Sequence, residues 1–413
     1  MAPSPTGFPH IGLIHTALFN WLFARHEGGE FRLRIENTDT SREVAEAVDQ
    51  IQASLRWLGL DVDGEVTFQL DRMEHCKQEA QRLLAEGKAY EGEGAIRIRM
   101  PDEGVTAWDD LIRGPIEVAN ETIEDLVLVR GDGRPTYNFA SPFEDVKDAI
   151  THVIRGDDHV SNTPKQIQIL EALGAPLPEY GHLANIHGSD GKKLSKRHGA
   201  QSIDEFRDAG YVAPALMNFL ALLGWSYDDK TTVMSRDEIV ERFTLDRVGA
   251  SPAVFDFQKL EWLNGVYLRE LPADEYADRL VAYLREQGYD WDEDLVRRAA
   301  PLVQEKIAAL GEFPEFAGFL FSAVEPDPAL LDGPVLGAAE QSLADTEPFT
   351  AEAIEASLRA LAQSLELKPR EAFQPIRVAV TGSKVSPGLF ESIELLGREE
   401  TLERIRRARA EVV

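Results

Sequence analysis

The residues best suited to chemistry fall in two short segments, one at the start of the chain and one near its middle. The first, "PSPTGFPHIG", places His10 two residues before Gly12, where a helix is expected to begin. The N–H groups and dipole of a helix N-terminus attract phosphate, and glycine lets a bulky ligand approach the backbone. The second, "GKKLSKRHGA", holds Lys193 and Lys196 in a glycine-flanked loop, where they could close over a polyphosphate and neutralise developing charge. Each segment taken alone is equally compatible with an ordinary surface loop.

Further charged side chains stand where predicted strands end. Glu36 closes the alternating segment "FRLRIE", and Arg155 and His159 lie in the loop "RGDDH" that follows "AITHVI". In open α/β sheets the ligand crevice lies beyond the carboxyl ends of the strands. These side chains, the first helix and the lysine-rich loop should therefore face one crevice. Asp157 and Asp158 are near enough to it to touch a ribose or a metal, or else they cap the next helix.

The elements that must position these residues alternate between helix and strand. Residues 11–27 are typical of a helix, 31–36 of a strand and 41–59 of a second helix, which is the order of a doubly wound sheet. The pattern resumes at 149–159, after an α+β segment whose last part, 125–140, is typical of a strand hairpin with "RGDG" as its turn. We expect an α/β protein with a doubly wound (Rossmann-like) parallel-sheet catalytic domain, an α+β insertion and all-α domains after it. The expected boundaries are 1–70 and 139–199 for the two halves of the catalytic domain, 71–138 for the insertion, and 200–275 and 276–413 for two helical domains.

Composition limits the class of protein. The chain has 413 residues and a net charge of −29. That charge argues against a nucleic acid as a binding partner, because contacts with phosphate need Lys and Arg. Local basic patches can still supply such contacts. Cys76 is the only cysteine, which excludes an internal disulfide and a cysteine-based zinc cluster. No apolar run has membrane-spanning length and the first residues lack the pattern of a signal peptide, so we expect a cytoplasmic protein with no membrane partner.

Together and in this order, "PSPTGFPHIG" and "KLSKR" resemble the two signature motifs of class I aminoacyl-tRNA synthetases. Other segments are similar to those of one branch, the bacterial glutamyl-tRNA synthetases of class Ib. They are "TALFNWLFAR", "FRLRIENTD", "RPTYNFA", "THVIRGDDHVSNTPKQ", "GKKLSKRHGA", "NFLALLGW", "SPAVFDFQKLEWLNG" and "VSPGLFESIELLGRE". The resemblance covers essentially the whole chain. It includes a C-terminal part that is typical of helices here and is a β-barrel in the related glutaminyl enzymes.

The resemblance implies a glutamate–tRNA ligase. L-Glutamate would attack the α-phosphate of ATP to give glutamyl-adenylate and diphosphate, and the 3′ end of tRNA(Glu) would then take the glutamyl group. ATP and Mg²⁺ are the implied cofactors, zinc is not expected, and the enzyme would be a monomer. A non-discriminating form would also charge tRNA(Gln). The insertion would bind the acceptor end of the tRNA, residues 200–275 its stem and residues 276–413 its anticodon.

The resemblance also assigns roles by motif position. Glu36 would hold the ammonium of glutamate, and Arg155 would hold a carboxylate through a bidentate fork, the alternative for Arg155 being an ion pair with Asp157 or Asp158. A neutral amide would leave a charge unpaired, which would exclude glutamine. The implied catalytic residues are His10, Gly12, Lys193 and Lys196; the ATP-binding set is Thr6, His10, Gly12, Lys193, Ser195, Lys196 and Arg197; and the glutamate-binding set is Ser4, Glu36, Tyr137, Arg155 and His159.

Three features depart from the family pattern. The family has a strand before "APSPTG", with an arginine that pairs with the substrate carboxylate, and neither is present, so we expect a short strand with an arginine upstream of Met1. No Cys-rich, zinc-binding stretch follows the "GKAY" helix, which makes the insertion shorter. Asn37 stands where the family usually has Asp.

Other functions compete with this one. The missing arginine favours a catalytically impaired tRNA-binding homologue, whereas intact His10, Lys193 and Lys196 argue against it. The helical C-terminal half disfavours a glutaminyl-tRNA synthetase. The same half is absent from shortened paralogues that modify a tRNA base and from small adenylyltransferases with a His-x-Gly motif.

Overall fold

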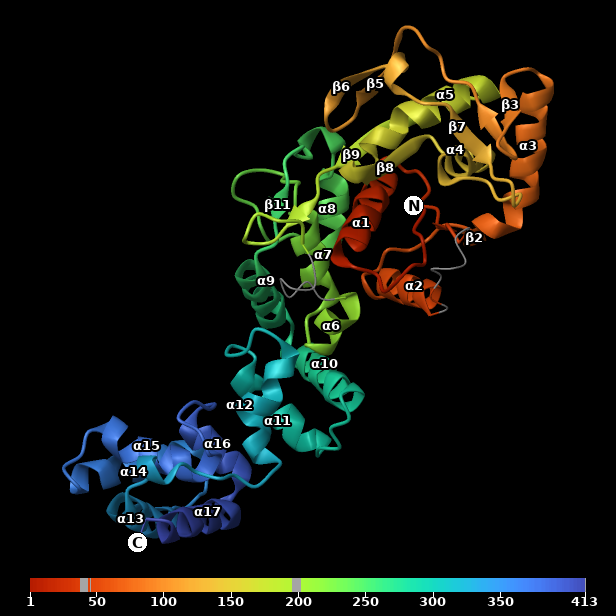
Figure 1. Ribbon diagram of the computed structural model, residues 1–413. Coiled ribbons are helices and arrows are strands. Elements are labelled where there is room, and N and C mark those ends of the chain that lie inside the picture. Colours follow the sequence, from red (N-terminus) through yellow and green to blue (C-terminus); the bar gives the residue numbers. More distant parts are fainter. Residues whose placement is uncertain (38–43, 45, 195–201, 413) are drawn as a thin grey trace. The chain divides into compact units, whose positions relative to one another are not determined.

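The computed structural model describes residues 1–37, 44, 46–194 and 202–412. They form two compact units: Met1–Phe206 with Ala213–Leu260, and Arg207–Val212 with Glu261–Val413. Figure 1 labels the elements of both. None of the helices in the described ranges is long and apolar enough to span a membrane.

The first unit is built on short strands that pair in parallel. The pairs are β1 (Arg34–Ile35) with β2 (Thr67–Phe68), β8 (His152–Gly156) with β9 (Glu179–Leu183), and β10 (Ile186–His187) with β11 (Ala253–Val254). The helices between and after these strands are α1 (Ile11–His26), α2 (Ala47–Trp57), α4 (Tyr137–Lys147), α5 (Thr163–Leu173), α7 (Ala213–Ala221) and α8 (Arg236–Arg242), and α6 (Ile203–Asp208) and α9 (Phe257–Glu270) carry residues of both units. The predicted parallel α/β arrangement is confirmed.

The N-terminal residues form the first strand-like segment of this unit. The N–H groups of Arg34 and Glu36 donate to the carbonyl oxygens of Met1 and Pro3, at 3.0 and 2.9 Å, and the Met1 nitrogen donates to Arg32 O at 2.8 Å. This is the pattern of a parallel pair. Residues 1–3 therefore lie beside the strand predicted at 31–36.

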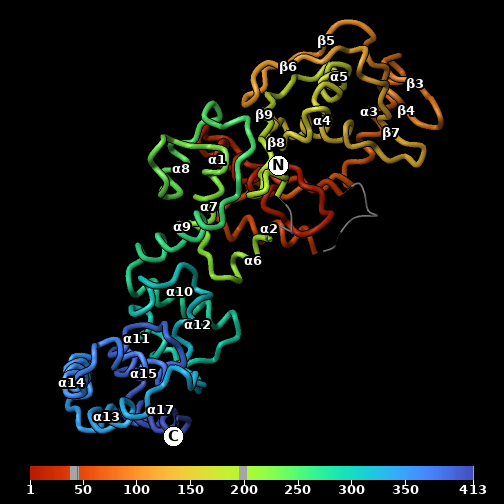
Figure 2. Tube along the Cα trace, turned by 60° about the vertical axis from the view of Figure 1, so that its left-hand side comes forward, coloured from red at the N-terminus to blue at the C-terminus, as the bar shows by residue number. Residues whose placement is uncertain are grey.

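Helix α1 follows this segment and packs beside β8, as Figures 1 and 2 both show. Ile14, Leu18 and Trp21 recur at helical spacing and are at most 1% exposed, which makes one face of the helix part of the core. The Asn20 amide nitrogen donates to Ile154 O at 2.9 Å. The helix N-terminus and the end of β8 are thereby held in one place.

The predicted insertion contains α3 (Met73–Ala85), an antiparallel sheet and a separate hairpin. The sheet is β3 (Ala89–Gly92), β4 (Ala95–Ile98) and β7 (Leu126–Val129), and the hairpin is β5 (Val105–Asp110) with β6 (Gly114–Ala119). The expected strand hairpin over 125–140 is wrong in its second half. Only an isolated bridge joins Val129 to Pro135, and Tyr137 begins α4, because Phe139, Ala140 and Phe143 are buried at helical spacing.

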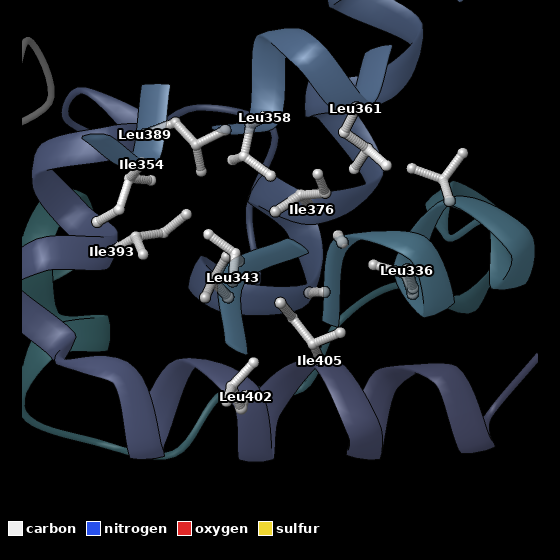
Figure 3. Close-up of a cluster of buried hydrophobic side chains, with 14 of the residues drawn as sticks. Leu336, Leu343, Ile354, Leu358, Leu361, Ile376, Leu389, Ile393, Leu402 and Ile405 are labelled. Atoms are coloured by element: carbon white, nitrogen blue, oxygen red, sulfur yellow. The ribbon is translucent and has the colours of Figure 1, made fainter. Parts of the chain in front are cut away.

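The second unit is helical in the residues described. Its helices are α10 (Ala273–Glu286), α11 (Glu293–Val303), α12 (Phe313–Ala317), α13 (Gly333–Ala344), α14 (Ala351–Ser364), α15 (Pro369–Thr381), α16 (Leu389–Leu396) and α17 (Arg398–Ala410). Figure 3 shows Ile354 and Leu358 of α14 pointing toward Ile376, Ile393 and Ile405 of the neighbouring helices. The amphipathic pattern of residues 335–408 thus corresponds to one shared core.

Candidate functional site

A cleft of about 1230 Å³ lies in the first unit, at the N-terminus of α1 and the carboxyl ends of β1 and β8. The predicted site residues that line it are Ser4, Thr6, His10, Gly12, Glu36, Tyr137, Arg155, His159 and Lys193. Ser195, Lys196 and Arg197 lie outside the described residues. The crevice expected from the strand ends is therefore present, and most of the predicted side chains face it.

One part of this cleft, which we call the exposed end, is formed by Thr6, His10, Gly12 and Lys193. His10 is the N-cap of α1, and its Nδ1 accepts the N–H of Leu13 at 3.1 Å. Desolvation and the nearby Lys193 ammonium lower the pKa of His10 from 6.5, so the ring is neutral at pH 7. Since Nδ1 accepts, the proton resides on Nε2, which makes His10 a hydrogen-bond donor for a ligand.

Gly12 gives the imidazole of His10 its space. A Cβ atom at this position would lie 3.3 Å from His10 Nδ1, which is a tight contact. Gly12 also carries the carbonyl that accepts the Thr16 hydroxyl at 3.0 Å. The glycine of the first motif thus keeps the N-terminal turn of α1 open to a ligand.

Lys193 stands on a tight turn after β10. The Gly188 N–H donates to Lys192 O, and the Leu194 N–H donates to Ile186 O, both at 2.8 Å. The Lys193 side chain is 63% exposed, and its Nζ lies 3.7 Å from Asp158 Oδ2. An exposed pair of this kind is worth little, so the ammonium remains available to an anion.

The other part of the cleft, which we call the buried end, is formed by Glu36, Tyr137, Arg155 and His159. The Arg155 guanidinium donates to Gln166 Oε1 at 2.8 Å and to Thr163 Oγ1 at 2.9 Å, both neutral acceptors. Among the residues that the structure describes, no carboxylate lies within ion-pair distance of Arg155. Of its five N–H donors these contacts leave some unused, so the cation can receive a carboxylate.

The alternative for Arg155, an ion pair with a neighbouring aspartate, is wrong. Asp157 pairs with Arg113 at 2.7 Å, and Asp158 faces Lys193. Asp157 also accepts a hydrogen bond from the Asn185 amide. Both aspartates are thus engaged by other residues.

Glu36 is 7% exposed at the end of β1. Burial raises the pKa of this carboxyl group to about 7, although the positive charges of Arg34 and Arg155 oppose the shift. Its Oε1 is buried without a hydrogen-bond partner in the described structure and lies 3.7 Å from an Arg34 nitrogen. A buried carboxylate with a free oxygen at the edge of a cleft is suited to an ammonium group.

Tyr137 and His159 lie close to each other at the buried end of the cleft. The Tyr137 hydroxyl lies 3.2 Å from His159 Nδ1, and the Asn162 amide lies 3.3 Å from the same atom. Burial and the charge of Arg155 lower the pKa of His159, and burial raises the pKa of Tyr137. Both groups are therefore neutral at pH 7 and offer hydrogen bonds without adding charge.

Arg34 is a cleft residue that sequence reasoning missed. Its side chain is 6% exposed and pairs with Glu144 at 3.0 Å and with Asp145 at 2.8 Å. Burial opposes the charged form, but the surrounding carboxylates raise the pKa of Arg34 above its ordinary value. The signal in the sequence was an arginine two residues before Glu36 on a strand. Its partners come from α4, whose first residues, 137–140, were expected to belong to a strand.

Asp110 and His182 were also missed. His182 Nδ1 lies 2.5 Å from Asp110 Oδ2, and both side chains are fully buried. His182 Nε2 accepts a hydrogen bond from Arg155 Nε at 3.2 Å. These residues are 72 positions apart, and no local pattern in the sequence connects them.

No three His, Cys, Asp or Glu side chains in the described ranges gather in a way that could hold a metal ion.

Ser4 and Thr6 are exposed in the opening loop, where the Thr6 N–H donates to Ser4 O at 2.9 Å. Their side chains are free to meet a ligand from the cleft wall.

Comparison with known families gives matches over both units. The family described as "tRNA synthetases class I (E and Q), catalytic domain" matches residues 1–95 and 91–262. The "Anticodon binding domain" family matches residues 275–409. The two catalytic-domain ranges meet at 91–95, next to the β3–β4 turn, where the sequence predicts a shortened insertion.

Curated relatives match the whole chain. The "Glutamate--tRNA ligase" of Thermodesulfovibrio yellowstonii is 43% identical and that of Geobacter sulfurreducens 40% identical, each over 98% of this chain and over 98% and 97% of the relative. The solved structure entitled a glutamate tRNA ligase from Elizabethkingia meningosepticum "in complex with its amino acid" superposes with a TM-score of 0.86 at 28% identity. That match covers 99% of this chain and 98% of the other.

Proposed function

This chain belongs to the class I tRNA synthetases for glutamate and glutamine, among the glutamate–tRNA ligases, and we propose that it charges tRNA(Glu). In the first step a carboxylate oxygen of L-glutamate attacks the α-phosphorus of ATP. The bond from that phosphorus to the bridging oxygen breaks, and diphosphate leaves. In the second step a ribose hydroxyl at the 3′ end of the tRNA takes the glutamyl group and releases AMP.

One observation carries the proposal: the cleft that is lined by His10 and Gly12 of the first motif and by Lys193 of the second also contains a cation without an ionic partner in the described structure. Arg155 has free N–H donors there, and Glu36 supplies a buried carboxylate at the same end. Glutamate can place its ammonium at Glu36 and one carboxylate at Arg155, and its other carboxylate is then the one that attacks ATP. Glutamine would leave a charge unpaired, and buried unpaired charges cost several kcal/mol.

We assign ATP to the exposed end. His10 and Thr6 would donate to phosphate oxygens, and Gly12 would let the nucleotide lie against the start of α1. Lys193 would neutralise charge as the α-phosphate becomes pentavalent, together with Lys196 by motif position. Ser195 and Arg197 would bind ATP, also by motif position. Chemistry of this kind depends on positioning and charge, and it needs no covalent nucleophile from the protein.

Magnesium would enter as part of the MgATP substrate. Mg²⁺ keeps several waters and is usually held by substrate phosphates with one or two carboxylates. Asp158 is the carboxylate of the cleft wall next to Lys193 and would face such an ion. Zinc has no role in the proposal.

The tRNA contacts are assigned by domain. Residues 71–138 would meet the acceptor end, 200–275 the stem and 276–413 the anticodon, the last being consistent with the family matched at 275–409. We propose, from the resemblance to the family, that the enzyme acts as a monomer. Its setting would be the cytoplasm, where tRNA is charged for translation.

ATP–diphosphate exchange tests the first step. We expect exchange with glutamate in the presence of tRNA(Glu), and at least 100-fold less with glutamine or aspartate. If glutamate supports no exchange while tRNA still binds, the chain is a catalytically impaired tRNA-binding homologue.

Charging of purified tRNA(Glu) and tRNA(Gln) tests the tRNA specificity. A discriminating enzyme would charge tRNA(Glu) alone. Charging of both would show the non-discriminating form, which makes glutamyl-tRNA(Gln) as a second product.

A further inference from the structure

The orientation of the Arg155 guanidinium is fixed by three neutral neighbours. Nη1 donates to Gln166 Oε1 at 2.8 Å, Nη2 to Thr163 Oγ1 at 2.9 Å and Nε to His182 Nε2 at 3.2 Å. Gln166 and Thr163 belong to α5, and His182 to β9. The plane of the cation is thus set by residues behind the cleft wall, since none of these three lines the cleft.

The contact with His182 has a defined direction. A guanidinium N–H can only donate, so His182 Nε2 must accept, and the imidazole must carry its proton on Nδ1. That Nδ1 lies 2.5 Å from Asp110 Oδ2, and Asp110 as a carboxylate can only accept. The three groups form a chain in which each hydrogen bond fixes the next: carboxylate, imidazole and guanidinium.

Asp110 is itself firmly held. Its Oδ1 accepts the N–H groups of Ile112, Arg113 and His182 at 3.1, 3.0 and 3.2 Å. Burial opposes the charged form, but the hydrogen bond from His182 and those from the backbone lower the pKa of Asp110 to about 2. The carboxylate is therefore ionised at pH 7 and can keep His182 in the required tautomer.

Asp110 comes from the predicted insertion and not from the parallel-strand region around the cleft. It is the last residue of β5, and the next N–H, that of Leu111, donates to Tyr180 O of β9 at 2.8 Å. Arg113 extends the same attachment through Asp157 and through the carbonyl of His182, with distances of 2.7 and 3.3 Å. The turn between β5 and β6 is thus joined to the strand that carries His182.

We propose that Asp110 and His182 are positioning residues for amino-acid selection, holding the Arg155 guanidinium so that its free N–H donors meet a carboxylate of glutamate. This rests on the proposed function, which gives Arg155 that carboxylate. It makes the β5–β6 hairpin of the insertion part of the amino-acid pocket, although neither residue touches the substrate.

The decisive variant is Asp110→Asn, which keeps the size of the side chain. The amide can donate to His182 Nδ1, and the histidine then carries its proton on Nε2. The Nε2–H of His182 and the Nε–H of Arg155 would then face each other, and two donors cannot form a hydrogen bond. We expect the KM for glutamate in ATP–diphosphate exchange to rise at least tenfold, and the KM for ATP to change less than twofold. His182→Phe breaks the chain one step nearer to Arg155 and should raise the glutamate KM by at least as much.

Thr106→Val is the matched control. Thr106 is a buried residue of the same strand, bonded to Asn120 at 2.6 Å and to Gln168 at 2.9 Å, with no link to Arg155. It should alter thermal stability as much as Asp110→Asn does and leave the glutamate KM unchanged. If Asp110→Asn does not fold, His182→Phe carries the same test against the same control.

A second background separates positioning from general damage. In an Arg155→Lys protein, Asp110→Asn should have no further effect on the glutamate KM, because the chain of hydrogen bonds ends at Arg155. A fully additive effect would overturn the inference. An unchanged glutamate KM in Asp110→Asn or in His182→Phe, with an active parent enzyme, would overturn it and leave the proposed function intact. A parent protein that does not activate glutamate at all would overturn both.

Discussion

The buried and exposed ends of the cleft are built in opposite ways. At the buried end, Arg155 is held by three neutral hydrogen bonds and Glu36 is 7% exposed. At the exposed end, the Lys193 side chain is 63% exposed and has a single long ion pair among the described residues. The protein positions the side chains of the buried end before any ligand binds. At the exposed end, the hydrogen-bond donors and the ammonium are brought together by the ligand.

The difference matches the tasks that we propose for the two ends. Distinguishing glutamate from glutamine requires charges that are already desolvated and fixed, because only then does a missing charge in the substrate cost several kcal/mol. Holding a polyphosphate requires positive charge and N–H groups, and the ligand supplies most of the binding through its own charge. Selectivity should therefore depend on the buried end, and rate on the exposed end.

The largest expected effect is that of Arg155→Gln. Loss of the cation leaves a substrate carboxylate without its partner in a desolvated site, which costs about 2 to 5 kcal/mol. We expect kcat/KM for glutamate in ATP–diphosphate exchange to fall by a factor of roughly 30 to 4,000. The matched control is Arg134→Gln, since Arg134 lines the same cleft with a side chain that is 46% exposed. An equal loss in both variants would mean that the cleft needs positive charge in general and not an oriented guanidinium.

Lys193→Ala should have the next largest effect and a different kinetic signature. Removing a cation that acts on the developing charge of the phosphate lowers kcat, by roughly 10- to 100-fold at an exposed position. The KM for glutamate should be unchanged. Lys192→Ala is the control, because Lys192 is the exposed neighbour on the same turn and does not line the cleft. A rise in the glutamate KM for Lys193→Ala would remove the functional distinction between the two ends.

The exposed and buried ends also differ in how much of each could be predicted from the sequence. The exposed end consists of local features: His10 caps the helix that begins one residue later, and Lys193 stands on a glycine-flanked turn. Such features are visible in a short window. The parallel strands and the helical second unit are also periodic patterns, and both were predicted correctly.

At the buried end, every residue that the sequence predicted lines the cleft, and the residues that hold them in place were missed. Strand alternation places Arg32 and Arg34 on one face, yet their side chains are 46% and 6% exposed. Arg34 is buried because Glu144 and Asp145 cover it, and these belong to a helix that the pattern at 125–140 did not reveal. The link from Asp110 to Arg155 likewise depends on tertiary packing between distant segments, which no local pattern specifies.

The pH dependence of glutamate binding tests the buried end without disturbing the exposed one. The carboxyl group of Glu36 has its pKa raised to about 7 by burial, and only its ionised form attracts an ammonium. Binding should therefore strengthen as pH rises, and the KM for glutamate should fall about tenfold between pH 6 and pH 8. The stability that Glu36 contributes has the opposite sign: it falls as pH rises from its ordinary pKa of 4.5 to 7, because the folded state holds the proton more tightly.

Glu36→Gln is the control for that pH profile. The variant should bind glutamate more weakly at every pH and lose the tenfold change. A profile that persists in Glu36→Gln would assign the titration to another buried group, such as Glu144 beside Arg34, whose pKa burial also raises to about 7.

The smallest expected effect is that of Gly12→Ala, and it tests how much freedom the exposed end has. The new Cβ would lie 3.3 Å from His10 Nδ1, so the imidazole must shift by a few tenths of an ångström. Alanine in place of glycine near the start of a helix also stabilises the fold, by up to about 1 kcal/mol. The melting temperature should therefore stay the same or rise while the KM for ATP rises about two- to fivefold. Gly29→Ala, whose Cβ would meet Ala24 O at an ordinary 3.7 Å, is the control for any effect of an added methyl group. Hydrogen-bond donors that adapt to their ligand should tolerate so small a shift of the imidazole. A loss of activity above 100-fold in Gly12→Ala would therefore mean that the exposed end is as rigidly positioned as the buried end.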